Sequence, residues 1–350
     1  MKRKRRISLV MSAVRSLVVL GIVGGAVTAN AQIYVTYFNK GDGVVGAFNF
    51  DGSAINASLI SGLQYPSGIA SDGTGNLYVP NTGANVVGKY TTSGATVNAA
   101  LISVPFPYQV VLDGHGFLYT VNEYLHYGKY TTTGWTVNAS FITNYSGGGI
   151  PSIACDGDYL YLSDSYNPNI AKYTTSGVLV NASLISMPNS DGTVSIACDG
   201  NGNLFVANGN VISKYTTSGV LLNASLASSG NRPYFMALDG VGHLFIANFG
   251  SGTIGEFTTE GVTINASLIS GLDEPSGVAV VIQPRLSIMA ADANVILTWP
   301  TNASGLTLQS TTDLVSSVWT TNSVAPVVVN GLNTVTNVIS GIQQFYRLSQ

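Results

Sequence analysis

Short apolar runs separated by glycine-containing polar turns recur along most of the chain. Within segment 66–102, the apolar runs are 67–71, 77–80, 86–92 and 96–102. The turns between them contain Asp-Gly, Asn-Thr-Gly and Ser-Gly, which favour hairpins and positive backbone φ angles. Because no stretch has the spacing of an amphipathic helix, the pattern predicts a four-stranded antiparallel meander.

The meander repeats with an almost constant period. The tract Asn-Ala-Ser-Leu-Ile, or a close variant, begins at Asn56, Asn98, Asn138, Asn181, Asn223 and Asn265. Successive copies are 42, 40, 43, 42 and 42 residues apart. An Asp-Gly pair keeps the same phase at Asp72, Asp113, Asp156, Asp199 and Asp239. A four-stranded unit repeated every ~40–50 residues is typical of a β-propeller blade.

The two ends of the array are complementary. Five complete units begin near Pro66, Pro107, Pro151, Asp191 and Pro233. Residues 33–60 match only the second to fourth strands of a unit, and residues 275–280 match only the first. We therefore predict an all-β, six-bladed propeller over residues 32–282, in which 277–281 pair with 33–36 and leave no free edge at the seam.

The repeat resembles a known family. Residues 66–81 read Pro-Ser-Gly-Ile-Ala-Ser-Asp-Gly-Thr-Gly-Asn-Leu-Tyr-Val-Pro-Asn, and Val87-Gly-Lys-Tyr follows. This resembles the NHL repeat and the six-bladed group that includes gluconolactonase-type enzymes and streptogramin lyases. The resemblance covers about residues 33–282 and implies the fold. The group holds enzymes, binding modules and scaffolds, so the function stays open.

The N-terminal segment has the order of a secretory signal peptide. Six of the 14 basic residues lie in the first fifteen positions without an acidic one, and an apolar run ends at Ala29-Asn-Ala. We expect cleavage after Ala31 and a secreted, periplasmic or cell-surface protein. A membrane anchor is the alternative, but the run is short and diluted by Gly, Thr and Asn. No other segment predicts a transmembrane span in the mature chain.

Residues 283–350 lack the repeat and predict a second domain. Their short strand-like runs are separated by turns and indicate a small β-sandwich with Trp299, Trp319, Phe345 and Tyr346 in its core. The segment resembles C-terminal β modules on secreted proteins of environmental bacteria.

Charge limits the choice of partner. Beyond residue 31, eight basic residues face 17 acidic ones, which argues against a nucleic-acid surface. We expect a monomer that binds a protein, a carbohydrate or a small molecule.

One end of the propeller is the expected ligand-binding face. The second strand of each complete unit ends in a polar residue: Asn81, Asn122, Asp164, Asn208 and Asn248. Tyr37 takes this place in the closing blade. Sixfold repetition predicts that they surround the channel mouth, although for any single side chain capping of its own turn is the favoured interpretation.

One loop at this face departs from the others and carries Glu123 and His126. A carboxylate with an imidazole is the minimum for general acid–base chemistry. The resemblance to streptogramin lyases, which use such a pair, makes them the catalytic candidates. The metal-binding Glu expected early in gluconolactonase-type enzymes has no counterpart, since no Glu precedes Glu123.

The sequence predicts no metal site and no cofactor. The Asp-Gly-x-Gly turns faintly resemble calcium loops, but each offers one carboxylate where calcium needs about six to eight oxygens. They are interpreted as turns capped by Asp. Cys155 and Cys198 occupy equivalent positions in neighbouring blades, and we expect free, buried thiols rather than a disulfide.

These observations favour a non-enzymatic, secreted propeller that binds a ligand or partner on one face. The alternative is a lactonase-like hydrolase or streptogramin-lyase-like enzyme that uses Glu123 and His126.

Overall fold

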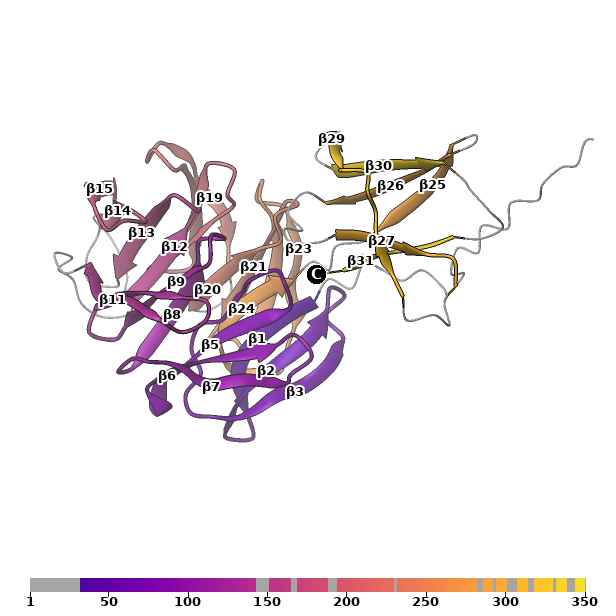
Figure 1. The fold of residues 1–350 in the computed structure, drawn as a ribbon. Helices are drawn as coiled ribbons and strands as arrows, with labels where there is room; N and C mark the ends of the chain where they lie inside the picture. The colour runs from indigo at the N-terminus through magenta and orange to yellow at the C-terminus, as the bar shows by residue number, and fades with distance from the viewer. Residues whose placement is uncertain are drawn as a thin grey trace, which may run out of the picture. The chain divides into compact units, whose positions relative to one another are not determined.

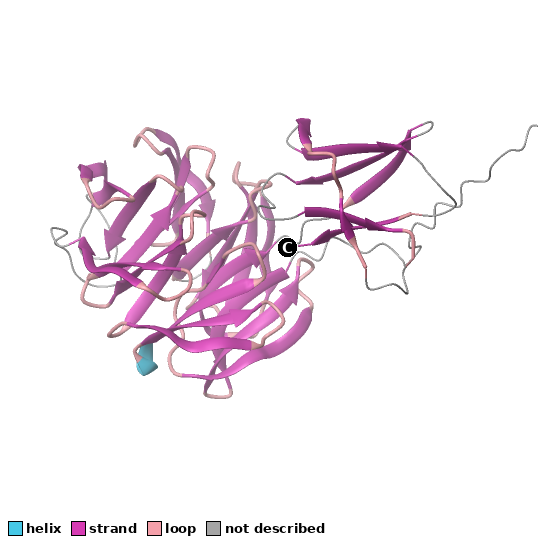
Figure 2. Ribbon diagram, in the orientation of Figure 1, coloured by secondary structure: helices cyan, strands magenta, loops and turns pink. Residues whose placement is uncertain are grey.

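The fold consists almost entirely of antiparallel β-sheets (Figures 1 and 2). The computed structural model describes residues 32–142, 151–164, 169–187, 194–229, 232–281, 286–291, 294–300, 307–313, 318–329, 332–338 and 344–349. The expected signal peptide, residues 1–31, lies outside them. The only helix in these ranges is the short 3₁₀ turn η1 (Thr82–Ala84), and none is long and apolar enough to span a membrane.

Six four-stranded sheets form the six predicted blades. Blade 1 contains β24 (Asp273–Val281), β1 (Gln32–Asn39), β2 (Asp42–Asn49) and β3 (Ala54–Leu63). Blade 2 contains β4 (Ala70–Ser71), β5 (Asn76–Asn81), β6 (Val86–Thr91) and β7 (Thr96–Ser103). Blade 3 contains β8 (Pro107–Leu112), β9 (Phe117–Asn122), β10 (Tyr127–Thr131) and β11 (Thr136–Ile142).

The remaining blades repeat this order. Blade 4 contains β12 (Pro151–Cys155), β13 (Tyr159–Asp164), β14 (Asn169–Thr174) and β15 (Leu179–Ser186). Blade 5 contains β16 (Val194–Cys198), β17 (Asn203–Asn208), β18 (Val211–Thr216) and β19 (Leu221–Ser228). Blade 6 contains β20 (Pro233–Leu238), β21 (His243–Asn248), β22 (Thr253–Thr258) and β23 (Thr263–Ile269).

The closure predicted from the sequence is confirmed. Strand β24 pairs antiparallel with β1, with Ile33 opposite Val280 and Thr36 opposite Gly277. The inner strands contact one another in the cyclic order β24, β4, β8, β12, β16, β20 and back to β24. Blade 1 thus joins the two ends of the array, and blades 3 and 6 lie opposite each other.

Apolar side chains fill the spaces between blades. The second strands are the most deeply buried; Leu77, Tyr78 and Val79 of β5 are inaccessible to solvent. One such cluster joins Tyr34 and Val45 of blade 1 to Leu77 of blade 2. Burial of this kind is the main source of stability in a stacked repeat.

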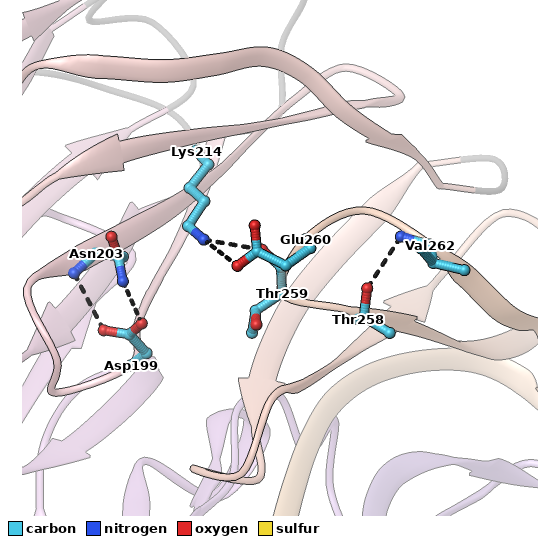
Figure 3. A network of polar contacts seen from close by, with 7 residues as sticks. All are labelled: Asp199, Asn203, Lys214, Thr258, Thr259, Glu260 and Val262. Carbon is cyan, nitrogen blue, oxygen red and sulfur yellow. Dashed lines mark hydrogen bonds and ion pairs between the residues drawn. The ribbon is translucent and has the colours of Figure 1, made fainter.

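A lysine in the third strand connects each of blades 2 to 5 to the blade that follows. The ammonium of Lys214 donates to the carbonyl oxygen of Thr259 at 3.0 Å, and Glu260 accepts a second bond (Figure 3). The equivalent lysines are Lys89, Lys129 and Lys172. They donate to the carbonyl oxygens of Thr132, Thr175 and Thr217, respectively. These bonds fix the angle between neighbouring blades because donor and acceptor belong to different sheets.

The Asp-Gly-x-Gly turns are capped by their own Asp, as predicted. Oδ1 of Asp72 accepts the N–H groups of Thr74 and Asn76 at 2.8 and 3.0 Å. Gly73 has a φ of 70°, which other residues rarely adopt. The same two bonds recur at Asp113, Asp199 and Asp239.

The C-terminal part forms a separate unit, with the boundary between residues 284 and 285. One sheet orders β25 (Ser287–Ala291), β26 (Asn294–Pro300), β30 (Leu332–Val338) and β29 (Val327–Val329). A second orders β28 (Thr320–Thr321), β27 (Thr307–Thr311) and β31 (Phe345–Ser349).

The predicted core of this unit is only partly correct. Trp299 is buried together with Leu297, Leu308 and Val335. Trp319, Phe345 and Tyr346 are only half-buried, so placing them in the core was wrong. Trp319 instead stacks beneath the guanidinium of Arg347, 4.3 Å from its ring centre, an arrangement that suits a partly wet site.

Candidate functional site

We call the end of the propeller where the inner strands begin and the second strands end the upper face. The last residues of the second strands lie there, as antiparallel pairing requires: Pro107 lies opposite Asn122, and Pro233 opposite Asn248. The Asp-capped turns lie at the other end, the lower face. His115 and His243 belong to those turns and are therefore separated from His126.

The asparagines at the upper face bond to groups of nearby loops. Asn81, Asn122 and Asn248 are buried, and Asn208 is half-buried. Oδ1 of Asn81 accepts the N–H of Gln64 at 2.6 Å, and Nδ2 of Asn248 donates to Thr253. The side chain of Asp164 lies outside the described residues. A direct ligand contact by this set stays a prediction.

Tyr37, the member of the set in blade 1, is also buried. Its hydroxyl donates to the carbonyl oxygen of Ala57 at 2.5 Å. It therefore ties two strands of its own blade together.

The loop with Glu123 and His126 is a tight turn held by Asn122. Oδ1 of Asn122 accepts the N–H groups of Tyr124 at 3.0 Å and His126 at 2.9 Å, as the Asp side chains do at the lower face. The N–H of Glu123 donates to the carbonyl oxygen of Phe106 at 3.0 Å. The side chains of Glu123 and His126 are exposed, and neither has a hydrogen bond or ion pair with another described residue.

The channel mouth is formed by the residue that follows the proline at or just before each inner strand, or that follows Val194 in blade 5. These mouth residues are Ser67, Tyr108, Ser152, Ser195, Tyr234 and Ser276. The serines link consecutive inner strands: Ser276 donates to Ser67 O at 3.0 Å, and Ser67 donates to Tyr108 O at 2.5 Å. The mouth therefore consists of four short and two long hydroxyl side chains.

The two tyrosines meet across this mouth. Tyr108 comes from blade 3 and Tyr234 from the opposite blade 6, and their hydroxyl groups are hydrogen-bonded to each other. Burial raises the pKa of both hydroxyls, which therefore stay neutral. The charges of Glu123 and Arg232 act on both, and that of Glu274 acts on Tyr234. The sequence-based prediction missed this pair. An alignment of the repeats would have revealed it, because the mouth position is tyrosine in these two repeats and serine in the other four.

An aromatic group surrounds Tyr234. Its ring stacks on Phe249 with centroids 5.0 Å apart and contacts Phe235 edge-on. The guanidinium of Arg232 lies over the other ring of the stack, 5.2 Å from the centre of Phe249. The site thus combines aromatic surface, two neutral hydroxyls and charges of both signs.

Among the non-glycine residues at the upper face that adopt the left-handed conformation, four share a further feature. They are Tyr65, Phe106, Arg232 and Glu274, with φ angles of 52°, 46°, 55° and 48°, and each precedes a proline. This region is disfavoured for side chains with a Cβ and disfavoured further before proline. Such strain gathers at functional sites, where the surrounding structure enforces it.

The inner strands enclose a channel of about 230 Å³ below the mouth. Its walls carry small and apolar side chains from every blade, with Cys155 and Cys198 among them. Both cysteines are free, as predicted, but each residue is half-buried rather than buried. Sγ of Cys198 donates to the carbonyl oxygen of Cys155 at 2.7 Å. Desolvation raises the pKa of Cys155 to about 12 and also raises that of Cys198.

Within the described residues, no group of three or more His, Cys, Asp or Glu side chains is arranged to hold a metal ion. The carboxylates of the Asp-Gly-x-Gly turns accept backbone bonds from their own turns, which leaves them poorly disposed as calcium ligands.

Comparison with known proteins gives a family and a fold. A sequence model of the virginiamycin B lyase family matches residues 19–297 of the chain. The structure of a nidogen/laminin complex is similar, with a TM-score of 0.57, 11% identity, and coverage of 72% of this chain and 98% of that one. No match was found among curated proteins.

A second similar structure is that of a catalytically inactive histidine-to-alanine variant of virginiamycin B lyase from Staphylococcus aureus with quinupristin. It has a TM-score of 0.51, 19% identity, and coverage of 78% of this chain and 93% of that one. At such identities the likeness shows the propeller fold alone.

Proposed function

This chain belongs to the virginiamycin B lyase family, and from that premise we propose that it is a secreted, non-enzymatic propeller that binds a ligand on its upper face. The observation that carries the proposal is the pair Tyr108 and Tyr234, whose hydroxyls meet above the channel between opposite blades. A rigid platform of this kind, surrounded by loops, is a typical ligand-binding surface.

Secretion rests on the N-terminal sequence. The basic start, the apolar run and the small residues before Gln32 have the order of a signal peptide. The two neutral thiols in the channel suit an exported protein that has no disulfide to form, since their high pKa keeps them unreactive.

The arrangement around Glu123 and His126 favours binding over catalysis. A general base must be oriented toward the proton it removes, usually through a hydrogen bond to a neighbouring group. Neither side chain has such a partner among the described residues, and both project from a turn that is held only through its backbone.

A second candidate function is a lactonase-like hydrolase or a streptogramin-lyase-like enzyme. Family membership favours the lyase, and the electrostatic influence of Glu123 on Tyr108 places a carboxylate near the hydroxyl pair. In that case Glu123 and His126 would transfer protons during ring opening.

Incubation with quinupristin separates the two functions. Ring opening is measured by liquid chromatography and mass spectrometry. We expect none above background for the intact protein, for Glu123→Gln or for His126→Ala. Turnover by the intact protein that falls by ~100-fold in either variant, the scale of a lost acid–base group, would establish the enzyme instead.

A further inference from the structure

Aromatic side chains stand exposed around the channel mouth. Tyr65, Phe106 and Tyr124 expose 69%, 38% and 59% of their surface. Phe106 packs edge-on against Tyr124, with ring planes at 88° and centroids 5.8 Å apart. Phe38 and Tyr65 form a similar pair at 70° and 5.7 Å. An edge-to-face contact holds each ring upright and leaves a ring face free for a ligand.

The backbone at two of these aromatic residues is conformationally strained. Tyr65 and Phe106 are two of the four left-handed residues before proline. The N–H of Phe106 donates to Oδ1 of Asn85 in the preceding blade, and its carbonyl oxygen accepts from Glu123. Since neighbouring loops enforce the strained conformation from both sides, the display of the ring is a built feature of the fold.

Polar groups lie between the rings. Glu123, Arg232 and Glu274 influence the Tyr108–Tyr234 hydroxyls electrostatically, which places charges of both signs beside the aromatic surface. The exposed Glu123 side chain has no hydrogen-bond partner among the described residues. The site therefore has hydrogen-bonding capacity that its own side chains leave unused.

We propose that the upper face binds a neutral carbohydrate chain, an inference that rests on the proposed binding function and names its ligand class. The apolar C–H face of a sugar ring packs on an exposed aromatic ring. Its hydroxyls, which are both donors and acceptors, pair with carboxylates, a guanidinium and tyrosine hydroxyls together. A strongly charged ligand of either sign meets at least one repelling group at this site, because the charges of Arg232, Glu123 and Glu274 all act on the hydroxyl pair. An apolar peptide leaves those charges unpaired.

The test is affinity electrophoresis of the full chain in gels containing neutral polysaccharides (xylan, laminarin and galactan) or acidic ones (alginate and heparin). We expect retardation by at least one neutral polysaccharide and by neither acidic one. Tyr124→Ala is expected to weaken binding by roughly 10-fold, the scale of one lost aromatic contact.

Trp135→Ala is the matched control. Trp135 belongs to the same blade and exposes 77% of its surface, but it follows the turn between β10 and β11 at the lower face. Its loss is expected to leave retardation unchanged. Both variants should have the same melting temperature as the wild type, because both side chains are exposed.

The opposite outcomes overturn the proposal. Retardation by acidic polysaccharides alone, or by none, shows that the ligand is not a neutral carbohydrate. An equal effect of Tyr124→Ala and Trp135→Ala shows that the upper face is not the site. Binding of quinupristin without turnover, in the absence of retardation, refutes the carbohydrate and leaves the binding function standing. Turnover of quinupristin refutes that function itself.

Discussion

The Glu256 carboxylate lies 3.6 Å from Nδ1 of His243, at the position where blades 2 to 5 carry their connecting lysine. The same nitrogen lies 2.8 Å from the Asp239 carboxylate. Blades 2 to 5 use this position for a hydrogen bond to the next blade. Blade 6 instead uses it for a cluster of its own side chains, formed by Asp239, His243 and Glu256. Both carboxylates are buried, so their charges carry a desolvation penalty.

This cluster predicts a pH-dependent gain of stability in Glu256→Gln. Desolvation raises the pKa of Glu256, the charge of His243 lowers it and that of Asp239 raises it again. A carboxyl with a raised folded-state pKa supports folding below its unfolded value and loses that contribution as pH rises through the folded value. The glutamine variant is therefore expected to be more stable than the wild type at pH 8, with the difference vanishing near pH 4.

Urea unfolding at both pH values measures this difference. Glu260→Gln serves as the control, since that carboxylate is largely exposed and should show no such pH dependence. A glutamine variant less stable than the wild type at pH 8 would mean that the pairing with His243 outweighs the cost of burial.

The connecting lysines predict a loss of stability in Lys214→Met. The lysine side chain is 11% exposed, and its bond to the Thr259 carbonyl joins blades 5 and 6. A hydrogen bond to a charged donor contributes about 1.5–3 kcal/mol, and the half-buried Thr259 carbonyl would lose that bond. The midpoint of urea unfolding should fall accordingly.

Glu260→Gln tells the two partners of Lys214 apart (Figure 3). Glu260 is 79% exposed, so its ion pair with Lys214 contributes less than about 1 kcal/mol. Equal losses in Lys214→Met and Glu260→Gln would assign the effect to the ion pair instead of the carbonyl bond.

The channel cysteines predict slow reaction with thiol reagents. With the pKa of Cys155 at about 12, almost no thiolate forms at neutral pH, and the thiolate is the reactive species. Native protein should therefore label slowly with a chromogenic disulfide reagent. Denatured protein without reductant should release two equivalents, whereas none would reveal a disulfide.

Closure by β24 predicts that the N-terminal strands are indispensable. Deleting residues 33–60 removes β1, the strand that pairs with β24, and leaves the edge of β24 without a partner. Free sheet edges recruit other chains, so aggregation is expected in size-exclusion chromatography. Deleting residues 287–350 removes only the second unit and should leave a soluble propeller. A monomeric product of the first deletion would contradict closure.

The blades were predictable because their signals are local. Alternation within each strand and glycine at each turn lie within a few residues, and the period repeats them until they are unmistakable. The closing strand was also predictable, since residues 275–280 match the one strand that residues 33–60 lack.

The candidate site was less predictable because its central contact is not local. Tyr108 and Tyr234 are 126 residues apart and meet only through the geometry of opposite blades. Local sequence also cannot decide which way a side chain turns. For Asn122 the sequence favoured a turn cap and left a ligand group open, and the structure directs its oxygen to the N–H groups of Tyr124 and His126.

The outermost strands shape how separate molecules meet. In every blade the pairing between third and fourth strands shifts register, and the Asn of the repeated tract accepts the N–H two residues on, as Asn138 does from Ser140. A strand interrupted in this way offers an approaching edge no unbroken series of donors and acceptors. Six blades accordingly present six outer edges to solvent without a template for fibre growth. Such interruptions at the rim oppose edge-to-edge association of a chain that is rich in β-structure and carries few charges.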